Sequence, residues 1–122
     1  VRRQRKILGG ALRQVGVLGA ACLYAVKNNI KRLKEDHERA SFLANALNPY
    51  HCKKNGKDLQ NFTNMVFFEP IEKKGSDLLS FLKNRGIIIS KPSPETRLVM
   101  HLNITDEILN NFIKTVKEFY GD

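Results

Sequence analysis

Two stretches in the N-terminal part of the chain carry apolar side chains at helical spacing. Residues 11–28 predict a long helix rich in glycine and alanine, whose small side chains let another backbone approach closely. A second helix is predicted to follow and to end at Asn48-Pro49, because proline disfavours helical backbone in the residue before it. Six of its side chains recur at intervals of three and four and therefore share one face: Ile30, Leu33, His37, Ala40, Ala44 and Leu47.

The rest of the chain mixes strand patterns with loops. A polar loop over residues 49–62 is followed by an apolar run over residues 64–69 that is rich in β-forming side chains. Two further short strands are predicted over residues 87–90 and 97–102, on either side of a loop stiffened by prolines.

Two more helices are marked by their ends. Ser76 and Asp77 are predicted to cap a third helix, and Gly86 to end it. Thr105 is predicted to cap a last helix that has acidic residues in its first turn. The inner face of this last helix carries an apolar stripe: Ile108, Leu109, Phe112, Ile113, Val116 and Phe119.

This order of elements predicts an α/β chain, and more narrowly an α+β small domain. We expect a small, mostly antiparallel three-stranded sheet covered by helices on one side, preceded by a long connecting helix. Residues 1–29 are predicted to be a basic segment and connecting helix that packs on a larger domain outside this sequence. Residues 30–122 are predicted to be the small domain itself.

Composition narrows the class of protein. The chain has 122 residues, 42% hydrophobic and 27% charged, which is typical of a folded globular protein. The longest nearly uncharged segment, residues 14–26, is shorter than the roughly 20 residues that a membrane-spanning helix needs. The arginine-dense start does not resemble a secretory signal, so a cytoplasmic protein without a membrane partner is predicted. Because the sequence opens with Val, we expect it to begin inside a longer polypeptide.

The two cysteines predict neither a metal site nor a disulfide. Cys22 is interpreted as a reduced core thiol and Cys52 as an exposed one. The formal net charge of +9 raises the possibility of nucleic-acid binding, but the basic residues are spread over the helices without interleaved aromatic side chains. A solvated basic surface with no nucleic-acid partner is therefore predicted.

Basic side chains concentrate in the first fourteen residues around the pair Gly9-Gly10. Accessible glycine amides, a following helix N-terminus and fixed positive charges together predict an anion site best suited to phosphate. The cations are Arg2, Arg3, Arg5, Lys6 and Arg13.

Arg97 is the residue of the C-terminal half that is best suited to bind a ligand. It begins an apolar strand directly after the proline-bearing loop, where its planar guanidinium can match a carboxylate. The alternative is an arginine at the sheet edge that points into water. His101 shares its face by strand alternation but has no evident partner, His37 fits a core or interface position, and His51 fits a plain loop residue. The residues alone define no catalytic centre.

Several segments, in the right order along the whole chain, resemble the low-specificity L-threonine aldolases. These are pyridoxal-phosphate enzymes of the aminotransferase-like fold type I, and the resemblance covers about the C-terminal third of such an enzyme. The segments that carry it are residues 5–14 (RKILGGALRQ), 16–24, 32–38 (RLKEDHE), 63–68 (TNMVFF), 82–87, 96–101 (TRLVMH) and 104–105.

The resemblance implies roles for three residues. Arg97 is expected to bind the substrate carboxylate, and Lys6 and Arg13 are expected to contribute to the region of the cofactor phosphate, across a subunit interface. The Schiff-base lysine and the histidine that stacks on the cofactor are expected upstream, so no catalytic residue and no metal ligand is assigned here. Ala11 stands where the family usually has a third glycine, and Leu12 where it has Met.

The activity implied is cleavage of L-threonine or L-allo-threonine to glycine and acetaldehyde with pyridoxal 5'-phosphate, in a homo-oligomer expected to be a tetramer. These residues alone, without the upstream lysine, are expected to be inactive. Another fold-related lyase or transaldolase acting on β-hydroxy amino acids remains an alternative. So does a free-standing basic module that binds nucleic acid through residues 2–13, with affinity that falls steeply as salt rises.

Overall fold

The computed structural model describes residues 1–53, 56–71, 75–91 and 94–121. The chain divides into two compact units, Val1–Arg32 and Leu33–Asp122, and each is described by itself. Part of the proline-bearing loop and Asn55 lie outside the described residues. Among the described residues, no helix has both the length and the apolar character needed to cross a membrane.

The first unit contains two helices, α1 (Arg2–Ile7) and α2 (Val15–Asn28). The prediction of a helix starting at residue 11 is wrong at its beginning, and the preceding short helix was not predicted. The chain leaves α1 through Gly9, whose φ of 78° suits glycine, and enters α2 through Gln14, whose φ is 50°. These two left-handed positions separate the helices.

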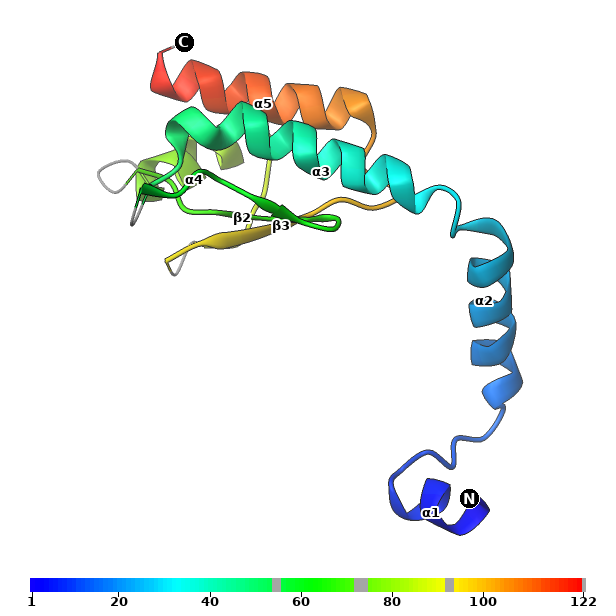
Figure 1. Cartoon of the computed structure of the whole chain (residues 1–122). Helices are drawn as coiled ribbons and strands as arrows, with labels where there is room; N and C mark the ends of the chain where they lie inside the picture. The colour runs from blue at the N-terminus through cyan, green and yellow to red at the C-terminus, as the bar shows by residue number, and fades with distance from the viewer. Residues whose placement is uncertain (54–55, 72–74, 92–93, 122) are drawn as a thin grey trace. The chain divides into compact units, whose positions relative to one another are not determined.

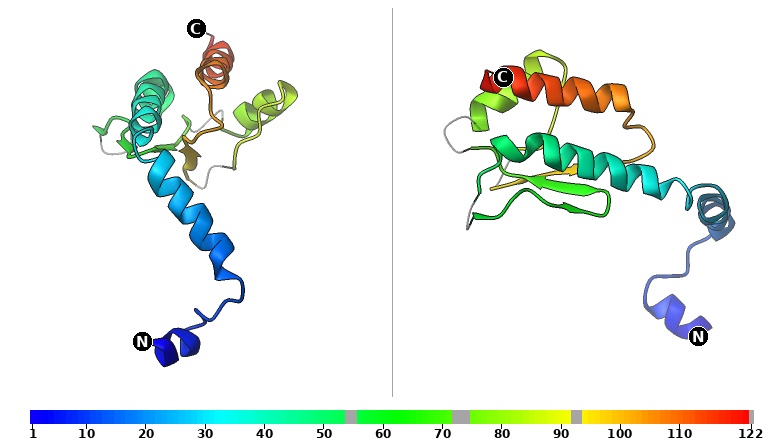
Figure 2. Two further views of the ribbon diagram at one scale, coloured as in Figure 1. Left: turned by 90° about the vertical axis from the view of Figure 1, so that its right-hand side faces the viewer. Right: turned by 45° about the horizontal axis from the view of Figure 1, so that its top comes forward.

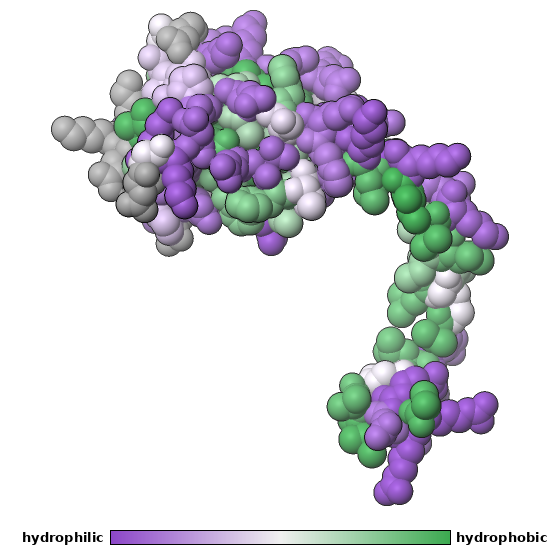
Figure 3. All heavy atoms as spheres, viewed as in Figure 1, coloured by the Kyte–Doolittle hydropathy of each residue, from purple (hydrophilic) through white to green (hydrophobic). Residues whose placement is uncertain are grey.

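No residue of α1 or α2 is buried within the first unit. Figure 3 shows hydrophobic side chains along the part of the chain labelled α2 in Figure 1. Cys22 is exposed there, so it is not a core thiol within this unit. Cys52, in the second unit, was predicted to be exposed but is half-buried.

The second unit places helices over one face of a three-stranded antiparallel sheet. The strands are β1 (Asn61–Phe62), β2 (Met65–Phe68) and β3 (Thr96–Val99), in the order β1-β2-β3. Both further views of the fold place α3 (Leu33–Leu47) and α5 (Asp106–Tyr120) on the same side of this sheet (Figures 1 and 2). This arrangement confirms a small antiparallel sheet covered by helices on one side.

The strands differ in part from those predicted. Residues 87–90 form no strand, although they follow Gly86 as expected, and β1 supplies the third strand from within the predicted polar loop. That loop also contains a short 3-10 helix, η1 (Asn48–Tyr50), and the buried Leu59. The reason is that a strand exists only where another strand pairs with it, and the pattern of side chains does not show which segments pair.

Helix α3 turns part of the predicted face to the core: Ala40, Ala44 and Leu47 are buried as predicted. His37, Leu33 and Ile30 are exposed, so the histidine is not a core residue. The other buried positions of α3 are Asp36 and Leu43, so the buried stripe is rotated slightly from the predicted one. Both stripes have helical spacing, and only the packing partner decides between them.

The other two helices of this unit mostly follow the prediction. α4 (Gly75–Asn84) begins at residue 75, so Ser76 and Asp77 lie inside its first turn and not at its cap. Gly86, with φ of 77°, follows its end as expected. In α5, the Thr105 hydroxyl accepts a hydrogen bond from the amide of Ile108, which confirms the cap, although Ile108 itself is exposed.

The core of the second unit lies between the sheet and the helices. Phe68 of β2 is fully buried, and the rings of Tyr50 and Tyr120 stack with centroids 4.6 Å apart at its margin. The buried apolar residues are Ala40, Leu43, Ala44, Leu47, Tyr50, Leu59, Val66, Phe68, Leu78, Leu82, Leu98, Met100, Leu109, Phe112, Ile113 and Val116.

Candidate functional site

Arg97 lies on the sheet face opposite α3 and α5, which we call the open face. Successive residues of a strand point to opposite faces, and in β3 Thr96 and Leu98 are buried while Arg97 is exposed and Val99 half-buried. Across the ladder, Phe67 of β2 pairs directly with Arg97. The members of the open face are Phe62, Met65, Phe67, Arg97 and Val99, as the registers Phe62↔Met65, Met65↔Val99 and Phe67↔Arg97 require.

The guanidinium of Arg97 has no hydrogen bond, ion pair or ring contact with any residue that the structure describes. The other two arginines of the second unit are engaged. The Arg85 guanidinium lies 3.5 Å from the centroid of the Phe81 ring, and its Nε is 3.6 Å from a carboxylate oxygen of Glu118. Arg97 is therefore the arginine of this unit whose donors remain available for an added carboxylate.

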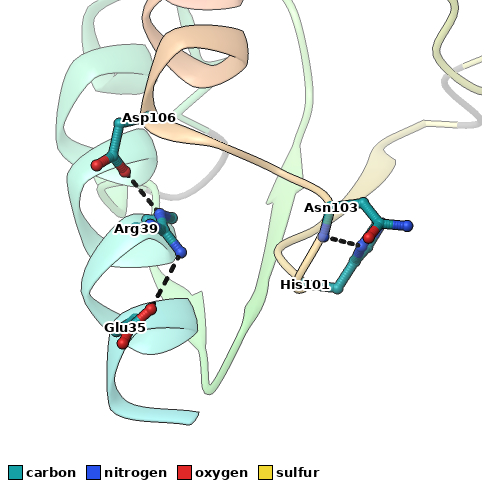
Figure 4. Close-up of polar contacts among 5 residues, drawn as sticks. All are labelled: Glu35, Arg39, His101, Asn103 and Asp106. Carbon is teal, nitrogen blue, oxygen red and sulfur yellow. Dashed lines mark hydrogen bonds and ion pairs between the residues drawn. The ribbon is translucent and has the colours of Figure 1, made fainter. Parts of the chain in front are cut away.

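The third arginine, Arg39, is held by carboxylates of two helices. Its Nε donates to Asp106 of α5 at 2.6 Å, and its Nη1 lies 3.7 Å from Glu35 one turn earlier in α3 (Figure 4). The hydrogen bond to Asp106 raises the pKa of the Arg39 guanidinium above its ordinary value, with smaller contributions from the charges of Asp106 and Glu35. These contacts join α3 to the start of α5 and leave Arg39 little capacity for another anion.

The described residues of the second unit line two cavities of similar size. One, of about 500 Å³, lies largely on the helix side, between Leu98 of β3, residues 87–90 and the first two turns of α5, and it reaches Arg97 and Val99 at the β3 edge. The other, of about 510 Å³, is lined by Glu35, Glu38 and Asp106 around Arg39. Two arginines line the first cavity: Arg85, which is engaged by Phe81 and Glu118, and Arg97, whose donors could pair with an added carboxylate. The second carries an excess of carboxylates and would repel one.

The histidines are placed differently from the prediction. His101 lies beyond the end of β3, in a turn where its Nδ1 accepts a hydrogen bond from the amide of Asn103 at 3.3 Å (Figure 4). His51 is more than a plain loop residue, since it pairs with Pro70 in a β-bridge and its Nδ1 accepts from the amide of Glu69 at 3.2 Å. Both histidines have local structural contacts, and neither touches Arg97 through any recorded interaction.

In the first unit, the glycine pair does not present free amides. The amide of Gly9 donates to the carbonyl of Lys6 at 3.3 Å, and the amide of Gly10 donates to the carbonyl of Arg5 at 2.8 Å. A Cβ on Gly10 would lie 2.9 Å from Cγ of Arg5, so glycine is required there to close the end of α1. The predicted backbone cradle for a phosphate is therefore wrong.

What fits a phosphate in this unit is the set of cationic side chains. Lys6 and Arg13 are both exposed and belong to the first unit, whereas Arg97 belongs to the second. An ammonium group and a guanidinium can both pair with a phosphate dianion, so these side chains suit a phosphate group although the glycine backbone does not. Among the residues that the structure describes, no three His, Cys, Asp or Glu side chains gather in a way that could hold a metal ion.

The neighbourhood of Arg97 on the open face was not predicted from the sequence. The patterns of residues 64–69 and 97–102 each predicted a strand, but nothing in them specifies that the two strands pair or in which register. A one-residue slip would place Phe67 on the other face from Arg97.

Comparison with known proteins shows what the chain is similar to. Residues 1–69 match the family model of the beta-eliminating lyases. The chain is 41% identical over 108 residues to the low specificity L-threonine aldolase of Escherichia coli strain K12, covering 88% of this chain and 31% of that protein. It is 36% identical over 106 residues to low-specificity L-threonine aldolase 1 of Arabidopsis thaliana, covering 83% of this chain and 29% of that protein. The chain thus spans about a third of the length of these relatives.

Proposed function

The chain belongs to the beta-eliminating lyase family, and we propose that it is the C-terminal portion of a pyridoxal-phosphate-dependent threonine aldolase of fold type I. In the complete enzyme, the reaction would cleave L-threonine or L-allo-threonine into glycine and acetaldehyde. The observation that carries the proposal is Arg97, an exposed arginine without a recorded partner among the described residues, beside a largely apolar cavity. The relatives named as threonine aldolases support it.

In the proposed mechanism, Arg97 orients the substrate. Two parallel hydrogen bonds from its guanidinium to the carboxylate fix the rotation of the amino acid, so that the Cα–Cβ bond is held in the orientation that cleavage requires. The chemistry that pyridoxal phosphate supplies when bound is an electron sink for the electron pair released from that bond. Lys6 and Arg13 are proposed to hold the cofactor phosphate by charge, across a subunit interface.

The first unit is proposed to pack on a larger domain of the complete enzyme. The apolar side chains of α2 support this, since a helix that is apolar around its circumference is usually buried. Val17, Leu18 and Leu23 point to three different sides of this helix and are 73%, 53% and 54% exposed within the unit. The 122 residues alone are accordingly expected to be inactive, and the complete enzyme is proposed to be a cytoplasmic tetramer, which light scattering on the purified enzyme would test.

The role of Arg97 is tested in the complete enzyme by following acetaldehyde released from L-threonine. Arg97→Ala should raise KM by about 30- to 1,000-fold, the range expected when a charge-paired hydrogen bond to a ligand is lost. Arg97→Lys should be intermediate, because lysine keeps the charge but lacks the two-pronged geometry. The absorbance of bound pyridoxal phosphate should be unchanged in both variants.

Lys114→Ala is the matched control, since it also removes an exposed cation but lies on α5 away from the open face. Its KM should equal that of the wild type. An unchanged KM in Arg97→Ala would refute the assignment of Arg97. A panel of L-threonine, L-allo-threonine and other β-hydroxy amino acids would distinguish the aldolase from a related lyase.

A further inference from the structure

Phe67 is the side chain that the sheet places nearest to Arg97. The two residues pair directly across the β2–β3 ladder, and directly opposed side chains have Cβ atoms about 4.5–5.5 Å apart on the same face. Phe67 is half-buried, whereas Arg97 is exposed. No other aromatic side chain is paired directly with Arg97 in the described sheet.

The Phe67 ring is itself held in place. Phe62 of β1 lies diagonally across the β1–β2 hairpin, and the two ring centroids are 5.9 Å apart at an interplanar angle of 72°. This edge-to-face arrangement is a preferred geometry for aromatic pairs. The face of Phe67 is therefore oriented by an edge contact from the next strand, although Phe62 is itself 58% exposed.

We propose that Phe67 is a positioning residue for Arg97, an inference that rests on the proposed function. A free arginine side chain samples many rotamers, and binding a carboxylate requires it to give up that freedom. An aromatic ring directly opposite offers an apolar surface along which the arginine stem can lie, while the guanidinium stays free for the carboxylate. Phe67 thus lowers the entropy lost when Arg97 binds the substrate carboxylate, without touching the reacting atoms.

The inference predicts an effect on substrate binding rather than on the chemical step. In the complete enzyme, Phe67→Ala should raise KM for L-threonine about three- to tenfold, the cost of ordering one long side chain, with kcat within about twofold of wild type. Phe67→Tyr keeps the ring and should restore wild-type KM. Phe62→Ala removes only the edge contact and should raise KM about twofold.

Two further variants keep the test decisive. Phe67→Leu retains most of the apolar volume, so it should fold even if Phe67→Ala does not and loses bound pyridoxal phosphate. Because it lacks the ring, Phe67→Leu should still raise KM about threefold. Phe42→Ala is the matched control, since Phe42 is 52% exposed but lies on α3, on the helix side of the sheet. Its KM should not change.

Combining Phe67→Ala with Arg97→Ala separates a role through Arg97 from a general loosening of the unit. If Phe67 acts through Arg97, the double variant should have the same KM as Arg97→Ala alone. An equal KM rise in both backgrounds overturns the inference, as does a Phe67→Ala or Phe67→Leu enzyme with wild-type KM. A wild-type enzyme that neither cleaves L-threonine nor binds glycine overturns the proposed function itself.

Discussion

Thr96 has a buried hydroxyl group that makes no hydrogen bond with any described residue. The residue is 1% exposed, and its Oγ1 has no hydrogen-bond partner there. Its side chain points to the helix-covered face of the sheet, opposite Phe68 in the ladder. Leaving a buried hydroxyl unpaired costs about 1–3 kcal/mol. Thr96→Val replaces the hydroxyl by a methyl group of similar shape and keeps a residue that favours strands.

Thr96→Val is therefore expected to stabilise the second unit by about 1–2 kcal/mol, because part of the hydroxyl penalty is regained and packing is otherwise kept. For a unit of this length that corresponds to a rise in Tm of roughly 4–16 °C. Urea unfolding followed by circular dichroism would measure the free energy of unfolding. The slope with denaturant should stay constant, since the surface exposed on unfolding is nearly the same.

Thr115→Val is the matched control, with the opposite sign expected. Thr115 is also buried, at 4% exposed, but its Oγ1 donates to the carbonyl of Asn111 at 2.8 Å. The same substitution there should cost about 0.5–1.5 kcal/mol, the net value of one hydrogen bond. If Thr96→Val proves as destabilising as Thr115→Val, the Thr96 hydroxyl has a partner and the reasoning is refuted.

Two more perturbations test local features of the second unit. Thr105→Ala removes the cap of α5 and should lower the free energy of unfolding by about 1 kcal/mol in the same urea assay, whereas Thr105→Ser should keep most of it. The pKa of Asp58 is lowered, first by the hydrogen bond from Lys53 and then by one from Asn48. Because the pKa of Asp58 is lower in the folded state, ionised Asp58 stabilises the folded protein at pH values above the ordinary pKa of 3.8. This stabilisation is lost as the pH falls through the folded-state pKa. The loss of stability below about pH 4 should therefore be smaller in Asp58→Asn, as thermal unfolding across a pH series would measure.

Features of the fold set by neighbouring residues were predictable. The cap at Thr105, the left-handed Gly86 and most of the buried stripe of α5 each depend on contacts within one or two helical turns. Strand β2 was also predicted, since its apolar run is long and dense. Of the candidate site, Arg97 was placed on a strand by the pattern, and the family resemblance gave its expected role.

The remaining features depend on which backbone groups pair with one another, and the pattern of side chains does not reveal this even where the partners are close in sequence. Residues 87–90 carry the same β-forming character as β2 but pair with no strand, whereas the polar Asn61 starts β1 because the hairpin brings it beside Val66. The amides of Gly9 and Gly10 were expected to be free, but α1 uses them to close its own end.

The sequence by itself determined the cap of α5 at Thr105, the end of α4 before Gly86 and that a small sheet lies under helices, because these follow from local hydrogen bonds and from apolar periodicity. Only the tertiary structure decided which stripe of α3 faces the core and that Phe67 stands opposite Arg97 on the open face. The physical reason is that strand register and helix rotation are set by which distant surfaces fit together, and a shift of one residue changes every side chain's surroundings while leaving the local pattern the same.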